Sequence, residues 1–300
     1  MKSPIFLSRK VMAKVAKQFV RLALFVTVAA LLSACSILDV INLLPVTPGA
    51  TVEQAISYGD HSRKKLDVYR PINPTSSSAI IVYFYGGGWH QGDRGLYRFL
   101  GHKLASMGHY AVIPDYRLFP EAVFPSFVED GAEAVNYVLD NLNTIANQDR
   151  PVFLMGHSAG AHISAMITLD PRFLENVGHR TDELAGFIGL AGAYDFLPIT
   201  SKKTGAAFPD KTNRKQSQPI TFIDETDPPL FLAHGDKDKR VWLKNSLNLA
   251  NRTKDFSIPA TLKVYPEVGH ADILRPFVPF MGDDHGLLSA ISDFVYRHSK

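Results

Sequence analysis

The feature that most constrains the fold is an alternation along the chain between short apolar runs and longer stretches with helical periodicity. Unbroken apolar runs are typical of strands in a parallel sheet, because such strands are covered on both faces. Strands that alternate with helices imply βαβ units. The predicted strands span residues 78–86, 109–116, 151–157, 186–192, 229–235 and 260–266, and the predicted helices span residues 95–108, 125–142, 159–170, 241–252 and 284–298.

This pattern predicts one α/β domain over residues 51–300, with a mostly parallel central sheet and helices on both faces. Two earlier runs within residues 52–71 predict an antiparallel hairpin at the sheet edge. A hydrophobic content of 46% and a charged content of 20% suit a globular domain with a sizeable core. Residues 197–227 are long, polar and aperiodic, and we interpret them as a small lid, with a plain surface loop as the alternative.

The first 34 residues differ from the rest and predict a secretory signal. Six basic residues and no acid precede an uncharged apolar run over residues 22–32, and small residues follow at Ser33 and Ala34. A basic region, an apolar region and a small-residue cleavage site are the parts of such a signal. The apolar run is short for a bilayer span, which needs about 20 residues. A tilted N-terminal anchor is the alternative.

The single cysteine, Cys35, stands directly after this segment. Leu32-Ser33-Ala34-Cys35 resembles the lipobox of bacterial lipoproteins, in which the signal is removed before the cysteine and the thiol carries a lipid. A lone cysteine in an exported protein forms no internal disulfide and calls for another explanation. The resemblance implies a membrane partner through lipidated Cys35, with residues 35–50 as a tether. Ser36 after the cysteine implies the outer membrane of a bacterial envelope, facing the periplasm.

The charge balance gives no reason to expect a polyanionic partner. The chain has 32 basic and 29 acidic residues, but six of the basic residues belong to the predicted signal. The remainder has a net charge of −3. We therefore predict no nucleic acid partner and no basic membrane-binding face on the domain.

The strongest chemical motif is G-x-S-x-G at Gly156-His157-Ser158-Ala159-Gly160. It follows a predicted strand and opens a predicted helix, which is the context of a nucleophile elbow. The tight turn needs small flanking residues, and the helix N-terminus favours developing negative charge at Ser158. A serine that merely caps the helix is the alternative.

A serine nucleophile needs a base that is oriented by an acid, in the chain order Ser, Asp or Glu, His. His270 follows the predicted strand 260–266 and suits the base. Asp236 and Asp238 both follow the strand 229–235, and spacing does not choose between them; Asp195 is a third candidate. Other histidines suit the role of base less well. We expect a structural role for His234 and solvent exposure for His285 and His298.

Three adjacent glycines in the stretch YFYGGGWHQGD, residues 83–93, end another predicted strand. A phosphate-binding loop, a loose turn or an oxyanion hole would each use them. No Lys-Ser/Thr pair follows, and no dinucleotide-binding pattern surrounds them, which argues against a phosphate site. No H-E-x-x-H or paired C-x-x-C motif predicts a metal.

Together GHSAG, GGGW, the order Ser158–Asp238–His270, and DYRLFPEAVFPSFVED from Asp115 resemble the α/β-hydrolases. The closer resemblance is to the hormone-sensitive-lipase-like carboxylesterases and acetylesterases, over about residues 52–299. It implies the α/β-hydrolase fold, with HGDKDKRV placing the acid on Asp238. It also implies a serine hydrolase of short- to medium-chain acyl esters that needs neither metal nor organic cofactor.

The same resemblance implies an oxyanion hole made of backbone N–H groups from Gly87, Gly88 and Ala159. One departure is visible: Tyr85 stands where the family usually has the histidine of H-G-G-G. A backbone donor survives a change in a neighbouring side chain, so this departure puts in question only how the loop is braced and which alcohols fit. The alternatives are an arylformamidase-like amide hydrolase and a non-catalytic envelope lipoprotein that uses the fold as a scaffold. The oligomeric state stays open.

Overall fold

The computed structural model describes residues 37–46 and 49–299. The predicted signal and Cys35 lie outside the described residues. By its contacts the chain divides into Met1–Leu44 and Pro45–Lys300. In the first unit the described part is helix α2, Ile37–Leu43, which falls within the segment predicted as a tether. No helix among the described residues is long and apolar enough to cross a membrane.

The second unit is built on an eight-stranded sheet with the order β1-β2-β4-β3-β5-β6-β7-β8. Strands β1 and β2 are antiparallel to each other and β2 is antiparallel to β4, while all later pairs are parallel. This confirms the mostly parallel sheet and the edge hairpin. The strands are β1 Ala50–Ser57, β2 Lys65–Pro71, β3 Ile80–Phe84, β4 Tyr110–Pro114, β5 Val152–His157, β6 Leu184–Leu190, β7 Leu230–Gly235 and β8 Ala260–Tyr265.

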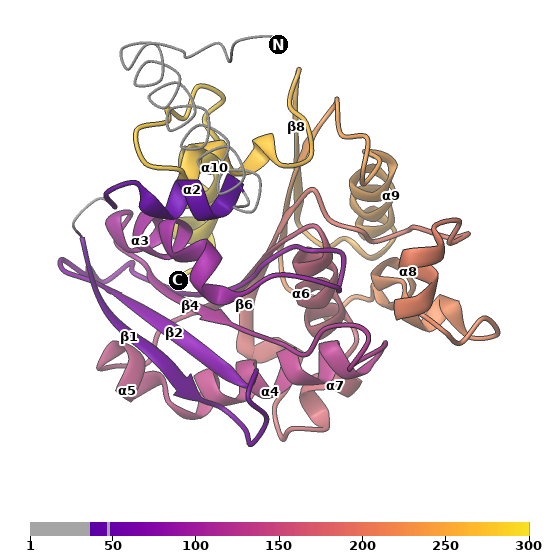
Figure 1. The fold of residues 1–300 in the computed structure, drawn as a ribbon, viewed down its shortest axis with the longest axis horizontal. Helices are drawn as coiled ribbons and strands as arrows, with labels where there is room; N and C mark the ends of the chain where they lie inside the picture. The colour runs from indigo at the N-terminus through magenta and orange to yellow at the C-terminus, as the bar shows by residue number, and fades with distance from the viewer. Residues whose placement is uncertain (1–36, 47–48, 300) are drawn as a thin grey trace, which may run out of the picture. The chain divides into compact units, whose positions relative to one another are not determined.

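Helices cover both faces of this sheet (Figure 1). Helices α3 and α10 lie on one side, and α4, α6 and α9 lie on the other. The α-helices of this unit are α3 Arg98–Ser106, α4 Ser126–Asp140, α5 Leu142–Ala146, α6 Ala159–Leu169, α7 Arg172–Glu175, α8 Lys202–Ala207, α9 Lys244–Arg252 and α10 Leu287–His298. The 3₁₀ helices are η1 Arg94–Tyr97, η2 Thr181–Glu183, η3 Arg214–Ser217, η4 Pro219–Phe222, η5 Thr253–Phe256 and η6 Asp272–Phe277.

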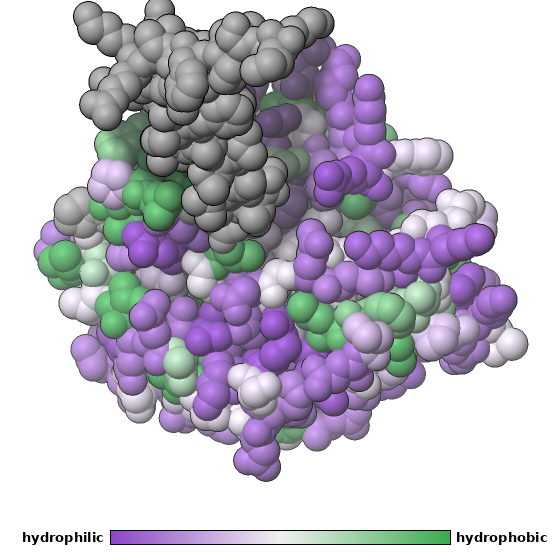
Figure 2. Space-filling model, viewed as in Figure 1, coloured by the Kyte–Doolittle hydropathy of each residue, from purple (hydrophilic) through white to green (hydrophobic). Residues whose placement is uncertain are grey.

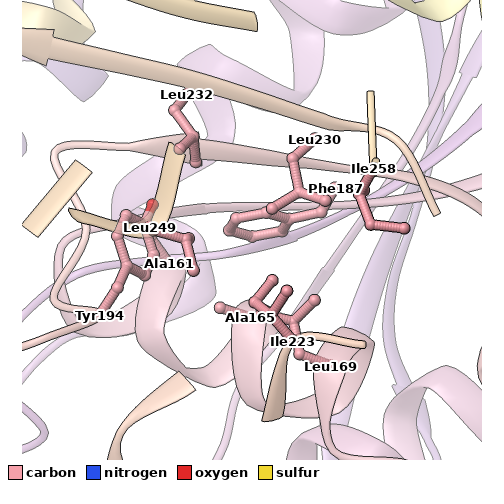
Figure 3. Packing of buried hydrophobic residues seen from close by; sticks show 10 residues of the cluster. All are labelled: Ala161, Ala165, Leu169, Phe187, Tyr194, Ile223, Leu230, Leu232, Leu249 and Ile258. Carbon is pink, nitrogen blue, oxygen red and sulfur yellow. The ribbon is translucent and has the colours of Figure 1, made fainter. Parts of the chain in front are cut away.

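Alternating side chains of the central strands supply the core on each face. On β7, Phe231 packs against Phe294 of α10, with ring centroids 5.7 Å apart. Its neighbours Leu230 and Leu232 belong to a buried cluster with α6 and α9 on the opposite face, as Figure 3 shows. Successive residues of a strand point to opposite faces, so an unbroken apolar run is what a sheet covered on both sides requires.

Several helices start later than their periodicity predicts, for local reasons. The predicted helix 95–108 begins as η1, where the Asp93 carboxylate accepts a hydrogen bond from Gly95 N, and becomes α-helical at Arg98. The last helix begins at Leu287 and not at residue 284. Here the Asp283 carboxylate accepts from Leu287 N at 2.7 Å, satisfying a donor of the first turn.

The segment 197–227, predicted as a lid, contains α8, η3 and η4 rather than one open loop. The segment is hydrogen-bonded to α6, where His162 Nε2 donates to Ser217 O at 2.9 Å. Near its end Asp227 is buried, and its carboxylate accepts from Asp224 N at 2.9 Å. Burial raises the pKa of the Asp227 carboxyl from 3.8 to about 7.

The raised pKa of Asp227 predicts a specific pH dependence of stability. Between about pH 4 and 7 the unfolded chain has lost this proton while the folded chain keeps it, so the free energy of unfolding falls as pH rises. This group contributes a slope of up to about 1.4 kcal/mol per pH unit. Asp227→Asn removes the slope, so its stability should exceed that of the wild type at pH 8 and approach it at pH 4.

Urea unfolding of both proteins at pH 4 and 8 measures this difference. Glu225→Gln is the matched control, because it removes the same charge from an exposed site. Its difference from the wild type should not change with pH. An Asp227→Asn difference that is equal at both pH values would contradict the burial argument.

Candidate active site

Ser158 occupies the sharp turn between β5 and α6, with φ 56° and ψ −121°. A positive φ is uncommon for a residue with a side chain and costs roughly 1–3 kcal/mol. The flanking glycines make the turn possible. A Cβ on Gly160 would lie 2.0 Å from Phe84 O of β3, and a Cβ on Gly156 would lie 2.4 Å from the backbone of Gly160. The sequence prediction of an elbow at this motif agrees with this backbone.

His270 lies in the loop after β8, 112 positions from Ser158 along the chain. Its Nε2 is 2.8 Å from Ser158 Oγ, and its Nδ1 is 2.7 Å from Asp238 Oδ2. A carboxylate only accepts, so Nδ1 carries the proton and Nε2 is left to accept from the serine hydroxyl. The three side chains therefore form one continuous row of hydrogen bonds.

The structure distinguishes the three candidate acids. Asp236 is exposed, and its carboxylate accepts from Glu267 N at 2.8 Å. Asp195 accepts from Asn248 Nδ2 at 2.6 Å. Among the described residues, only the Asp238 carboxylate hydrogen-bonds to His270.

Asp238 is held in this orientation from several directions. Its Oδ1 accepts from Arg240 N at 2.8 Å and from Val241 N at 2.9 Å. The Nε2 atom of the buried His234 lies 3.2 Å from Oδ2 of Asp238. This contact agrees with the structural role predicted for His234. Burial alone would raise the pKa of the Asp238 carboxyl, but hydrogen bonds from His234 and His270 outweigh it and hold the pKa well below its usual range. Asp238 is thus ionised at neutral pH.

His157 is a neighbour of the row to which sequence reasoning gave no role. Its Nε2 donates to His270 O at 3.0 Å, and the two rings lie 4.8 Å apart between centroids. Burial, reinforced by repulsion from His270, lowers the pKa of His157 to about 3, so the ring is neutral. It tethers the backbone of His270 directly. In the sequence, the signal for a role of His157 is its position directly before Ser158 in the G-x-S-x-G motif.

The glycine run lies directly against the elbow. A Cβ on Gly86 would lie 3.0 Å from Ser158 Cβ. Gly87 has φ 145°, and a Cβ there would lie 1.8 Å from Gln91 O; Gly88 has φ 61°. Among the described residues, the N–H groups of Gly87 and Gly88 donate no hydrogen bond. Ala159 is the first residue of α6, where an N–H has no partner within the helix.

Aromatic side chains flank this region on the side of the segment 197–227. The Trp89 ring lies 4.9 Å from Phe208 and 5.9 Å from Phe196 between centroids, and Phe208 stacks on Phe124 at 5.6 Å. Trp89 directly follows Gly88, so the cluster adjoins the glycine loop. Sequence reasoning did not foresee it, because its members come from four separate segments.

A cavity of about 300 Å³ borders this aromatic cluster. It shares Phe124 and Phe208 with the cluster and is also lined by Phe173 and by Arg172 and Arg214. Figure 2 shows hydrophobic residues gathered on the surface between the positions of α7 and α8, within a largely hydrophilic face. Within the described part of the chain, no group of His, Cys, Asp or Glu is placed to hold a metal ion.

The sequence of this chain matches a family of known proteins. A family model described as BD-FAE matches residues 66–253, which is more than half of the chain. The chain belongs to the BD-FAE family. The match includes Ser158 and Asp238, and His270 lies outside it.

Individual relatives include two kinds of hydrolase. A probable isoprenylcysteine alpha-carbonyl methylesterase from Oryza sativa subsp. japonica is 28% identical over 244 residues, covering 74% of this chain and 58% of that protein. A kynurenine formamidase from Salmo salar is 25% identical over 237 residues, covering 77% of this chain and 78% of that protein. The chain thus spans less than two thirds of the length of the first relative.

Solved structures show the fold. Esterase B from Lactobacillus rhamnosis, in a crystal structure with a tributyrin phosphonate, superposes with a TM-score of 0.72 at 18% identity, covering 97% of both chains. Together with the sheet order, this confirms the predicted α/β-hydrolase fold of the BD-FAE protein.

The packing of the elbow predicts that Gly160→Ala is severely destabilising. The new Cβ would meet Phe84 O, a backbone atom that cannot move aside without shifting β3. We expect a loss of about 3 kcal/mol or more in the free energy of unfolding. Gly205→Ala in α8 is the control, since its nearest neighbour would be 3.5 Å away and alanine favours helix by about 1 kcal/mol. Equal urea midpoints for Gly160→Ala and the wild type would contradict the packing argument.

Proposed function

We propose that this protein is a carboxylic ester hydrolase that works through Ser158, His270 and Asp238. The observation that carries the proposal is the continuous hydrogen-bonded row at the elbow, with separations of 2.8 Å and 2.7 Å. A serine hydroxyl is a weak nucleophile until an adjacent base takes its proton, and a third group orients that base. Membership of the BD-FAE family and the esterase relatives support the same reaction class.

In the proposed reaction, Ser158 Oγ attacks the ester carbonyl while His270 Nε2 takes the hydroxyl proton. The imidazolium then donates that proton to the leaving alcohol as the tetrahedral intermediate collapses to an acyl-enzyme. Water attacks the acyl-enzyme, with His270 again taking a proton and returning it to Ser158 as the acid leaves. The ionised Asp238 keeps the proton on His270 Nδ1 and stabilises the imidazolium.

The oxyanion would be stabilised by backbone N–H groups of Gly87, Gly88 and Ala159. Two features support this assignment: the glycine run adjoins Ser158, and Ala159 begins helix α6. Removing a single oxyanion donor typically costs about 10²–10³ in rate. A side chain on Gly87 would collide with Gln91 O, and the positive φ of Gly88 is unfavourable for a residue with a side chain.

The proposed substrates are esters with short to medium acyl chains. The cluster around Trp89 adjoins the glycine loop and offers apolar walls for acyl or alkyl groups. The tributyrin phosphonate bound by esterase B is a compound of this size range. The match with the kynurenine formamidase covers 78% of that protein, which favours one alternative, hydrolysis of an N-formyl amide by the same residues.

The purified protein should hydrolyse p-nitrophenyl butyrate, and Ser158→Ala should abolish that activity. N-formylkynurenine tested in parallel distinguishes the ester hydrolase from the formamidase. Faster turnover of the formyl amide would replace the ester proposal. Equal residual rates in wild type and Ser158→Ala on both substrates would leave only the non-catalytic scaffold.

The two adjacent acids provide a matched pair of variants. Asp238→Asn should lower kcat on the order of 10⁴-fold, the size expected when the acid of a triad is replaced by its amide. Asp236→Asn should stay within about threefold of the wild type, because surface substitutions away from such features have small effects. The reverse order in initial-rate assays would assign the role to Asp236.

We propose further that residues 1–34 are a signal and that Cys35 carries a lipid anchoring the protein to a bacterial envelope. The support is the lipobox-like sequence before Cys35. Cells expressing the wild type and fed radioactive palmitate should yield a labelled protein in the membrane fraction, and Cys35→Ala should yield none. Labelling that persists in Cys35→Ala would contradict this proposal.

A further inference from the structure

Tyr85 directly follows β3, immediately precedes the glycine run and is fully buried. Its ring is stacked between two others, with centroid distances of 5.3 Å to Tyr97 and 4.8 Å to Tyr116. A Cβ on Gly92 would lie 2.4 Å from the ring of Tyr85. The ring therefore fills the space beneath the loop of residues 86–93.

The hydroxyl of Tyr85 has two charged partners. It donates to Asp115 Oδ1 at 2.7 Å and accepts from Arg63 Nη2 at 2.8 Å. Asp115 directly follows β4, the neighbour of β3 in the sheet. The pair of hydrogen bonds fixes the end of β3 against the end of β4 and fixes the phenol in one rotational position. Hydrogen bonds to charged groups are about twice as strong as those between neutral groups.

Arg63 connects this phenol to the far end of the loop. It comes from the turn between β1 and β2, and the same Nη2 also donates to Gly92 O at 2.9 Å. Its Nε donates to Tyr116 O at 2.8 Å, and Tyr116 in turn donates its hydroxyl to Tyr85 O at 2.8 Å. One planar guanidinium thus holds three segments together in a geometry that an ammonium group cannot reproduce.

Asp115 also binds Arg94, the residue that directly follows this loop. Its Oδ1 accepts from Arg94 N at 2.8 Å, and its Oδ2 pairs with the Arg94 guanidinium. Arg94 Nε also donates to Asp67 Oδ1 at 2.8 Å. Two arginines are therefore matched by two buried carboxylates. Removal of one partner from such a group leaves an uncompensated buried charge, which is strongly destabilising.

Tyr85, Arg63 and Asp115 are found in three separate segments, yet all three converge on residues 86–94, the segment that contains Gly87 and Gly88. We propose that they form a positioning network that fixes the two glycine N–H groups for stabilisation of the oxyanion, which rests on the ester hydrolase proposed above. The network touches no reacting atom. It acts by holding a loop whose displacement by about 1 Å can cost 10²-fold in rate.

The chain offers a matched pair of tyrosines for the test. Tyr83 lies two residues earlier on β3 and is equally buried, but its hydroxyl has no hydrogen-bond partner in the described part of the chain. Tyr85→Phe removes two hydrogen bonds and keeps the ring, whereas Tyr83→Phe removes none. We expect Tyr85→Phe to lower kcat for p-nitrophenyl butyrate by about 10–100-fold with KM little changed.

Binding of an alkyl trifluoromethyl ketone reports on the oxyanion directly, because the ketone forms a tetrahedral adduct with the serine. Its Ki should rise in Tyr85→Phe by the same factor by which kcat/KM falls, and should be unchanged in Tyr83→Phe. Arg63→Lys keeps the charge but cannot make all three contacts, so it should show the same loss. Far-UV circular dichroism and melting temperatures identify any variant that fails to fold, and Arg63→Lys then takes the place of Tyr85→Phe.

Two outcomes would overturn the inference: Tyr85→Phe with wild-type kcat, or a loss of kcat without a matching loss of ketone affinity. Both outcomes differ from failure of the proposed function. If the proposed function were wrong, the wild type itself would hydrolyse esters no faster than Ser158→Ala.

Discussion

The close approach of α6 to β3 and β5 is the constraint on which the rest of the site depends. Gly160 lies so near Phe84 O that any side chain would collide with the strand, and a side chain on Gly156 would collide with the first turn of α6. With both positions bare, the chain reverses within one residue and leaves Ser158 at φ 56°. The energy of that conformation is offset by the packing of a wholly buried helix, α6, against the sheet. The position of Ser158 at the carboxyl end of β5 then determines where the acid, the base and the glycine run must lie.

From that point the parallel sheet supplies the partners. The loops after β7 and β8 bring Asp238 and His270 to the same edge as the elbow after β5, and β3 brings the glycine run. Ligands in such sheets bind at the carboxyl ends of the strands because the loops from neighbouring strands converge there. Local electrostatics then set the charge states. Hydrogen bonds keep Asp238 ionised, while burial keeps His157 neutral and able to hold the His270 backbone.

Much of this could be predicted from the sequence, because it depends on local signals. Apolar runs with intervening helical periods specified the strands, and G-x-S-x-G between a strand and a helix specified Ser158. The choice between Asp236 and Asp238 could not come from spacing alone. It depends on the loop turning so that Arg240 N and Val241 N hold one Asp238 oxygen while the other faces His270. The contacts of Tyr85 were equally inaccessible, since Arg63 and Asp115 are 22 and 30 residues away in the chain.

The central claim is that Ser158, activated by His270, forms a covalent bond with the acyl group. The most direct measurement is intact-protein mass spectrometry after treatment with a p-nitrophenyl alkylphosphonate, followed by peptide mapping of the adduct. The account predicts one adduct per chain, on Ser158, formed in parallel with loss of ester hydrolysis. Modification of a different residue, or complete loss of activity without an adduct on Ser158, would contradict it.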